Sequence, residues 1–213
     1  VYVAHNNRKL CKLVEDKIEE IRKHFNDVVL SVDTYKSRVA QEALEAGADM
    51  INDISACTFD ENMIEVLRKY KVPVIIMHIK GTPKNMQDNP EYKDVVREIT
   101  SFLRERIEVL ERNGIESDKI IIDPGIGFGK KLEHNIAIIR RLAELKQLKK
   151  PILIGLSRKS MIGMILGGIP PEERLTGTIA LNTIALLNGA SIIRVHDVKE
   201  GVQTCRIVET IIS

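Results

Sequence analysis

The sequence predicts an α/β protein built on a parallel sheet, and two observations support this prediction. Six short runs rich in β-branched residues each end in polar residues, and stretches with helical periodicity lie between these runs. Strands that alternate with helices are typical of parallel sheets, and in a closed barrel the chemistry gathers at the carboxyl ends of the strands. We therefore expect a TIM (β/α)8 barrel, with about six of its eight βα units present in these 213 residues.

The expected strands are the six apolar runs themselves, at residues 28–32, 48–51, 74–77, 120–122, 152–156 and 192–195. A barrel of eight strands lacks two of them here, so we expect those two upstream of Val1. This gives a single domain over residues 1–213 that is incomplete at its N-terminus. A doubly wound open sheet of six strands is the alternative, which we favour less because polar residues at every strand end suit a closed ring.

The expected helices follow from apolar spacing and from residues that start or stop helices. Residues 36–46 form a short helix that Gly47 ends as a C′ glycine. Asp60 is expected to cap a helix near residues 60–70. The remaining expected helices cover residues 8–25, 92–113, 133–147, 158–166 and 173–188, and a last one begins near Gly201.

Composition excludes several classes of function. The net charge of +2 is too small to indicate nucleic-acid binding, and the absence of Trp leaves no aromatic platform for single strands. No apolar stretch approaches the roughly 18 residues that a membrane span needs. The three cysteines are far apart and odd in number, so we expect reduced thiols and a cytoplasmic location.

Two of the first strands end in side chains that suit a flat heterocycle. Asp33 can accept hydrogen bonds from ring N–H groups, and the amide of Asn52 can donate and accept in one plane. The alternatives are local: Asp33 or Thr34 could cap the following helix, and Asn52-Asp53 could simply form a turn.

The stretch from Asp123 to Lys130 reads DPGIGFGK and is rich in glycine. It matches neither a Walker loop nor a dinucleotide fingerprint, because the glycine spacing is wrong for both. We therefore interpret Asp123 as a carboxylate at the edge of a ligand. Phe128 lies in a glycine turn, where it could form a stacking wall for a ring or simply pack the loop.

The last two strands end in cations and hydroxyls, at residues 157–160 (SRKS) and 194–196 (RVH). Arg194 and His196 point to the same side of a strand, and such a pair suits a phosphate or diphosphate. The alternative for these cations is a salt bridge with a neighbouring acid such as Asp197. His78 also ends a strand, and a catalytic and a structural role are equally compatible with its position.

Taken together, these segments resemble the dihydropteroate synthase family, in the order and spacing of that family. The resemblance covers nearly the whole chain from about residue 8, and its motifs are SVDTYKSRVAQEALEAGADMINDIS, VIIMHIKGTPKNMQ, IIIDPGIGFGKKLEHN, ILIGLSRKSMIG, ERLTGTIA and ASIIRVHDV. It implies a pterin-binding TIM barrel and a transferase of folate biosynthesis. This enzyme condenses p-aminobenzoate with 7,8-dihydropterin-6-ylmethyl diphosphate, and the products are 7,8-dihydropteroate and diphosphate.

The resemblance also implies roles for single residues. The catalytic residues would be Lys159, Arg194 and His196, of which Arg194 and His196 bind the diphosphate. Phe128 and Ser160 would border the p-aminobenzoate site. The pterin would be bound by Asp33, Asn52, Met77, Asp123, Gly155 and Lys159.

The resemblance further implies Mg²⁺ as cofactor and a homodimer. The Asn that holds the metal in the family would lie upstream of Val1, so we expect no metal ligand in this chain and this chain alone to be inactive. Two other functions remain open. One is a pterin-binding fragment or paralogue without catalysis, and the other is a methyltransferase that acts between methyltetrahydrofolate and a corrinoid protein. The second has no diphosphate to bind, which argues against it.

Overall fold

The computed structural model describes residues 8–212, and the chain divides into two compact units. The first unit contains the chain up to His78 and Leu103–Ile122, and the second contains Ile79–Phe102 and everything from Asp123 onward. The chain passes between the units after His78, again within helix α4 (Val95–Arg112) and again at the last residue of strand β4 (Ile120–Asp123). The single domain expected from the sequence stays a prediction.

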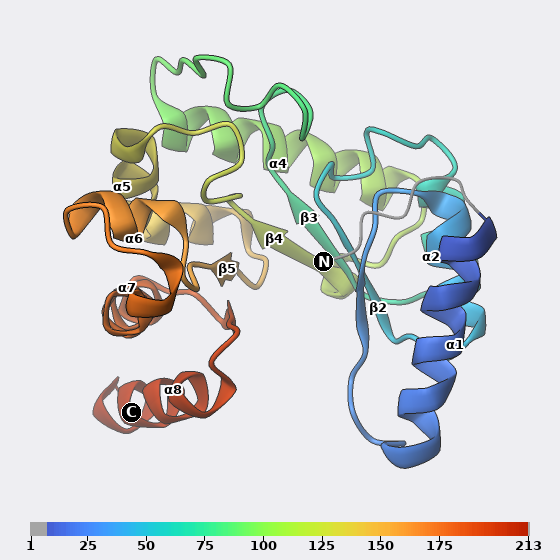
Figure 1. The fold of residues 1–213 in the computed structure, drawn as a ribbon. Coiled ribbons are helices and arrows are strands. Elements are labelled where there is room, and N and C mark those ends of the chain that lie inside the picture. The colour runs from blue at the N-terminus through green and yellow to red at the C-terminus, as the bar shows by residue number, and fades with distance from the viewer. Residues whose placement is uncertain (1–7, 213) are drawn as a thin grey trace. The chain divides into compact units, whose positions relative to one another are not determined.

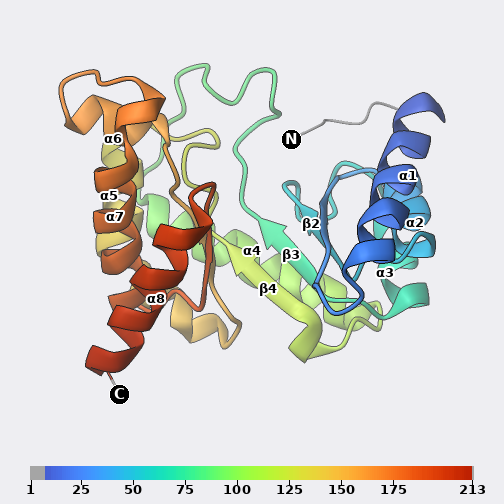
Figure 2. The same cartoon turned by 60° about the horizontal axis from the view of Figure 1, so that its bottom comes forward.

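A parallel sheet forms the centre of the first unit. Its four strands follow each other in sequence order, as β1 (Ser31–Asp33), β2 (Met50–Asp53), β3 (Val74–Met77) and β4. Figure 2 labels the last three of them. β1 pairs with β2 and β2 with β3, both in parallel. Every residue of β3 and β4 is buried, as expected where helices cover both faces of a sheet. The predicted α/β class with parallel strands is therefore confirmed.

Three helices pack in this unit in sequence order: α1 (Arg8–His24), α2 (Ser37–Glu45) and α3 (Met63–Tyr70). α1 contacts α2 and α2 contacts α3, and Figure 1 shows α1 and α2 side by side. The core lies between helices and sheet, where Met63 and Leu67 of α3 are fully buried. Gly47 follows α2 with a φ of 106°, which confirms the predicted C′ glycine.

Asp60 stabilises the N-termini of two helices, of which the sequence predicts one. Its Oδ1 accepts the backbone N–H of Asn62 at 3.1 Å, in the turn directly before α3, which begins at Met63. Its Oδ2 accepts hydrogen bonds from the backbone N–H of Ser37 at 2.8 Å and from its hydroxyl at 2.7 Å. Asp60 therefore stabilises the N-terminus of α2, which no side chain of its own segment caps.

The second unit contains a two-stranded parallel sheet, β5 (Leu153–Gly155) and β6 (Ile192–Arg194). Its further helices are α5 (Leu132–Arg140), α6 (Ser160–Ile165), α7 (Leu175–Leu187) and α8 (Val198–Ile212). The helix predicted at residues 133–147 is divided, since α5 ends at Arg140 and a 3₁₀ segment, Leu142–Leu148, follows it. α8 begins at Val198, ahead of the expected start at Gly201.

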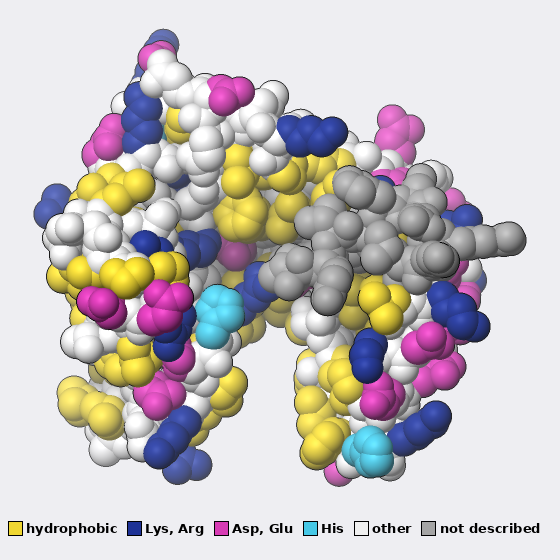
Figure 3. Space-filling view, viewed as in Figure 1, with side chains coloured by type: hydrophobic (Ala, Val, Ile, Leu, Met, Phe, Trp, Pro, Cys, Tyr) yellow, Lys and Arg dark blue, Asp and Glu magenta, His cyan; other side chains and the backbone are white. Residues whose placement is uncertain are grey.

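α7 packs against α8, yet both helices carry exposed apolar side chains. Figure 3 shows hydrophobic side chains on the surface over α6 and α8. The large exposed residues of this region are Met164, Ile165, Leu166, Ile184, Leu187, Val198, Val202, Ile207, Ile211 and Ile212. Within residues 8–212, no helix is both long enough and apolar enough to span a membrane.

Candidate active site

In the first unit, the sheet register brings Asp33 and Asn52 together. The two residues are direct partners on the neighbouring strands β1 and β2. Asn52 is 3% exposed, and its Nδ2 donates a hydrogen bond to Oδ1 of Asp33 over 2.8 Å. This bond fixes the orientation of the amide and leaves Oδ1 of Asn52 as a buried acceptor without a protein partner. A buried acceptor of this kind favours a ligand that brings an N–H or O–H donor.

A tight turn holds Asn52 in place from its C-terminal side. The next residue, Asp53, is fully buried, and its Oδ1 accepts hydrogen bonds from the backbone N–H and the hydroxyl of Ser55, at 2.7 and 2.6 Å. Oδ2 accepts the N–H of Cys57 at 3.0 Å, and Arg106 of α4 donates to the carbonyl of Ala56 at 2.9 Å. Burial raises the pKa of Asp53, although these hydrogen bonds oppose the shift. The turn read as an alternative for Asn52-Asp53 thus exists, but Asp53 forms it and Asn52 does not.

Met77 and His78 follow at the end of β3, and both are buried. Met77 is one residue beyond Ile76, which is the register partner of Asp53 on β2. The apolar side chain of Met77 is thus at the same end of the sheet as the Asp33–Asn52 pair.

In the second unit, Asp123 opens the glycine-rich loop. Its side chain is 7% exposed, and Oδ1 accepts the backbone N–H of Gly125 at 2.7 Å. Asn135 of α5 shapes the rest of the loop, because its Oδ1 accepts the N–H of Gly127 at 2.8 Å and its Nδ2 donates to the carbonyl of Lys131 at 3.0 Å. Gly127 has a φ of 81°, a conformation that L-residues rarely adopt.

Two lysines, the buried Lys130 and the half-buried Lys159, share the negative charge of Asp123. Lys130 is 3% exposed, and burial lowers its pKa to about 7 against the attraction of Asp123. Burial likewise lowers the pKa of Lys159 to about 8, again opposed by Asp123. The pKa of Asp123 is itself raised by burial, while the charges of Lys159, Lys130 and Arg194 act in the opposite direction. Such a cluster of shifted groups is typical of functional sites.

The ammonium groups of both lysines are fixed by the glycine loop. Nζ of Lys130 donates to the carbonyl of Phe128 at 2.9 Å, and Nζ of Lys159 donates to the carbonyl of Ile126. Nζ of Lys159 is also 5.0 Å from the centre of the Phe128 ring, a cation–π distance. The half-buried Phe128 is therefore beside Lys159, as a ring wall in this site would require.

A second segment supports the loop from outside. Gln87 donates to the carbonyl of Gly127 at 2.8 Å, and the hydroxyl of Tyr92 donates to the carbonyl of Gly129 at 2.7 Å. The space beside Gly129 is tight, because a Cβ there would lie 2.7 Å from the carbonyl oxygen of Lys80. The polar segment 79–90 and Tyr92 after it thus hold the glycine loop.

The ends of β5 and β6 carry the remaining predicted residues. Gly155 and Arg194 are register partners, and Arg194 and His196 are exposed. Lys159 forms the N-cap of α6 and the exposed Ser160 is its first residue. One cation predicted for this region has another partner: Arg158 binds both carboxylate oxygens of Asp197, at 2.7 and 2.9 Å. For Arg158 the salt-bridge alternative is correct.

The structure thus places the predicted residues in two sets, one in each unit. Asp33, Asn52 and Met77 share the carboxyl end of the first sheet, and the second set gathers around Asp123 and the ends of β5 and β6. That all of them surround a single pocket stays a prediction. Sequence reasoning missed Lys130 and Asp53 as members of these networks, although each adjoins or closely follows a residue that it identified.

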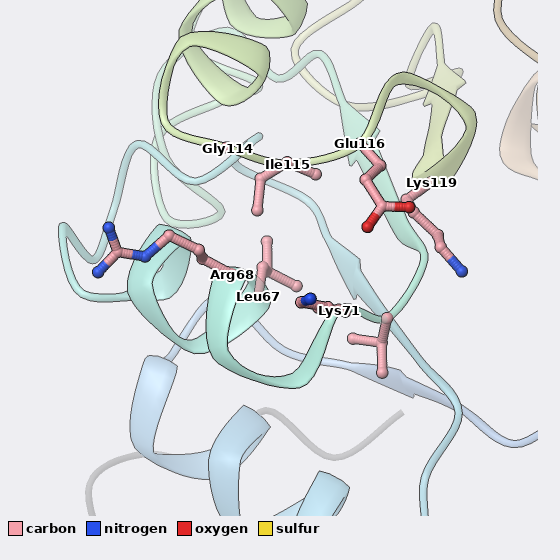
Figure 4. Close-up of a pocket in the computed structure, with 8 residues that line it drawn as sticks. Leu67, Arg68, Lys71, Gly114, Ile115, Glu116 and Lys119 are labelled. Carbon is pink, nitrogen blue, oxygen red and sulfur yellow. The ribbon is translucent and has the colours of Figure 1, made fainter.

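A small cavity of about 10 Å³ in the first unit does not qualify as a substrate site (Figure 4). Leu67 and Ile115 face each other across it. The residues that line it come directly before β3 or directly before β4 in the chain, so it is at the opposite end of these strands from Met77 and Asp123. Its volume accommodates about one water molecule. Within residues 8–212, no three His, Cys, Asp or Glu side chains gather as metal ligands.

Comparison with known proteins identifies the family. The family model described as "pterin binding enzyme" matches residues 6–196. The chain is 43% identical over 194 residues to the dihydropteroate synthase of Synechocystis, which covers 91% of this chain and 67% of that protein. It is 44% identical over 196 residues to the dihydropteroate synthase of Escherichia coli, covering 92% and 68% of the two chains. The chain therefore belongs to the pterin binding enzymes.

Solved structures agree with this assignment. The dihydropteroate synthase of Yersinia pestis, in a sulfonamide drug complex, superposes with a TM-score of 0.92 at 42% identity, over 98% of this chain and 75% of that chain. The enzyme of Xanthomonas albilineans in complex with 7,8-dihydropteroate superposes with a TM-score of 0.87 at 37% identity, over 95% and 73% of the two chains. Within the family, this chain is thus similar to dihydropteroate synthases in both sequence and structure.

Proposed function

We propose that this protein is a dihydropteroate synthase, which condenses p-aminobenzoate with 7,8-dihydropterin-6-ylmethyl diphosphate and releases diphosphate. The observation that carries the proposal is the similarity of more than nine tenths of the chain to dihydropteroate synthases of two distant bacteria. The Xanthomonas relatives bound to 7,8-dihydropteroate and to 4-aminobenzoic acid support the two substrate classes.

The polar groups of both units suit a pterin. In the proposal, Asp33, Asn52 and Asp123 bind the pterin edge, and Met77 and Gly155 line its pocket. The unpartnered Oδ1 of Asn52 supports this role, because a pterin N–H would supply the missing donor. Lys159 would donate to a pterin acceptor, since its ammonium is already fixed close to Asp123 by the glycine loop.

Catalysis in the proposal rests on charge and orientation. The bond between the pterin methylene carbon and the diphosphate oxygen breaks, and the diphosphate leaves with the electron pair. The exposed Arg194 and His196 would stabilise this anion as preorganised donors. The amine nitrogen of p-aminobenzoate then bonds to the methylene carbon and loses a proton. Phe128 and Ser160 would border the p-aminobenzoate, and positioning of the two reactants supplies the rest of the acceleration.

Other parts of the proposal go beyond the chain's own residues. A bound Mg²⁺ would neutralise charge on the diphosphate. The described residues gather no metal-ligand cluster, so we derive no step through the ion. We also propose a closed TIM barrel, a cytoplasmic location and a homodimer; the exposed apolar residues of α6, α7 and α8 offer a surface for the dimer.

The test is product formation from both substrates. The full-length protein with Mg²⁺, the pterin diphosphate and p-aminobenzoate is expected to form dihydropteroate and diphosphate in equal amounts, measured by chromatography. Arg194→Ala is expected to lose most of this turnover, whereas Arg206→Ala, an exposed arginine on α8, keeps it. Pterin binding without any product in the unmodified protein would overturn the proposal and favour a pterin-binding protein without catalysis.

A further inference from the structure

We infer that Ser157 is a positioning residue that selects the tautomer of His196 in which Nε2 carries the proton. The inference rests on the proposed function, because it assigns the anion-binding atom of His196. In the parallel pairing of β5 and β6, Gly155 and Arg194 are register partners. Two residues beyond this pair, Ser157 and His196 meet.

Two contacts join these side chains. Oγ of Ser157 accepts the backbone N–H of His196 at 3.1 Å, and the same Oγ is 2.9 Å from Nδ1 of the imidazole. Ser157 is buried and His196 is exposed. The Nδ1 edge of the ring is therefore anchored to the protein.

The position of the imidazole proton on His196 follows from the donors and acceptors around it. A serine hydroxyl has one proton to donate, and here one lone pair already accepts the His196 N–H. Within the described chain, Nδ1 is the one further partner of Oγ. If Nδ1–H donated to the second lone pair, the hydroxyl proton of the buried Ser157 would have no acceptor, so the hydroxyl donates to Nδ1. A neutral imidazole that accepts at Nδ1 carries its own proton on Nε2. Nε2–H is thus ready to donate to an anion before any anion binds.

A salt bridge one residue further along holds the two turns together. Arg158 binds Asp197 through both carboxylate oxygens, and its backbone N–H donates to Oγ1 of Thr178 at 2.9 Å. Arg158 has a φ of 54°, in the left-handed region, and these contacts hold it there. The Ser157–His196 contact is thus part of a ladder that continues the two strands beyond their last residues.

The first test reads the tautomer directly. In ¹⁵N-labelled protein, a two-dimensional spectrum of the imidazole nitrogens, assigned with His196→Gln, is expected to show neutral His196 with its proton on Nε2. In Ser157→Ala the ring is expected to become a mixture of both tautomers. A neutral His196 with its proton on Nδ1 in the unmodified protein would overturn the inference, and this result does not depend on the folding of Ser157→Ala.

The second test reads the consequence for an anion, with inorganic diphosphate as the probe in calorimetry. Ser157→Ala is expected to raise the Kd for diphosphate about tenfold, the loss of one net hydrogen bond, while the Kd of a pterin without diphosphate stays unchanged. Ser157→Thr keeps the hydroxyl and is expected to restore the affinity. Equal diphosphate affinity in Ser157→Ala and the unmodified protein would refute the inference. Failure of the unmodified protein to bind diphosphate would contradict the proposed function, while the tautomer is still read separately.

Discussion

Replacing Asp123 by asparagine is expected to weaken pterin binding about 10- to 150-fold. Asparagine has nearly the same shape as aspartate. In the unmodified protein the N–H of Gly125 donates to the carboxylate of Asp123 over 2.7 Å, and the one oxygen of the asparagine can still accept this bond. The loss is therefore the negative charge of a buried residue, which is only 7% exposed. A hydrogen bond to a charged group contributes about 1.5–3 kcal/mol, which corresponds to this range of affinity.

The assay is calorimetric titration with a pterin, compared with Asp118→Asn as the matched control. Asp118 is an exposed carboxylate that precedes the same strand, so its replacement is expected to leave the pterin Kd unchanged. Circular dichroism and thermal melting show that both variants are folded. A pterin Kd within twofold of the unmodified protein for a folded Asp123→Asn variant would refute the reasoning, and Asp123 would then be structural.

Three further predictions concern charge and the turns. Arg194→Ala is expected to raise the Kd of diphosphate by tenfold or more and to leave the pterin Kd nearly unchanged, because the charge of Arg194 contacts only the leaving group. Equal losses of affinity for both ligands in calorimetry would contradict the assignment of Arg194 to the diphosphate. Lys130→Met is expected to remove a rise of the unfolding free energy with pH. Folding lowers the pKa of Lys130 from 10.5 to about 7, so between these two pH values the unfolded chain binds one more proton than the folded chain. As the pH rises through this window, the unfolding free energy of the unmodified protein increases by on the order of 4 kcal/mol relative to that of the variant. Urea unfolding at pH 7 and pH 10 measures this difference, and parallel pH profiles would exclude the assigned shift. Asp53→Asn is expected to lower the unfolding free energy by about 1–3 kcal/mol, because an amide cannot accept hydrogen bonds from all the donors of Ser55 and Cys57. An unchanged midpoint of chemical denaturation would show that the turn does not depend on this carboxylate.

The parts of the site that the sequence predicts are those set by strand ends. A parallel strand that ends in Asp33 or Asn52 places that side chain at a known edge, and the register then makes the two residues partners. The strand periodicity alone contains this information. For Gly155, which only the family resemblance singled out, the structure adds that it is the register partner of Arg194 on β5 and β6.

Contacts between side chains distant in sequence were beyond prediction. Nothing in the local sequence shows that Asp60 caps α2 in addition to the turn before α3, because the hydrogen bond to Ser37 joins residues 23 positions apart. The pairing of Arg158 with Asp197 likewise depends on the ladder between two turns, 39 residues apart. For Arg158, composition allowed both an anion site and a salt bridge, and only the fold decides between them.

Buried charge was the other signal that the sequence did not reveal. Lys130 follows a glycine loop and precedes another lysine, a pattern that is more typical of an exposed turn. Its burial results from the packing of the loop against Asn135 and the segment that contains Tyr92. Charged residues in the loop that follows a strand-end carboxylate are thus candidates for its electrostatic network.

The most direct measurement of the central claim is the binding of one pterin to variants from both units, by calorimetry. We expect a single binding event in the unmodified protein, and a single event with a higher Kd in both Asn52→Ala and Asp123→Asn. Asn182→Ala serves as control, because Asn182 also has a buried Oδ1 without a partner but lies on α7. Unchanged affinity in either of the first two variants, or a loss equal to theirs in Asn182→Ala, would contradict the claim that these strand-end groups bind the pterin.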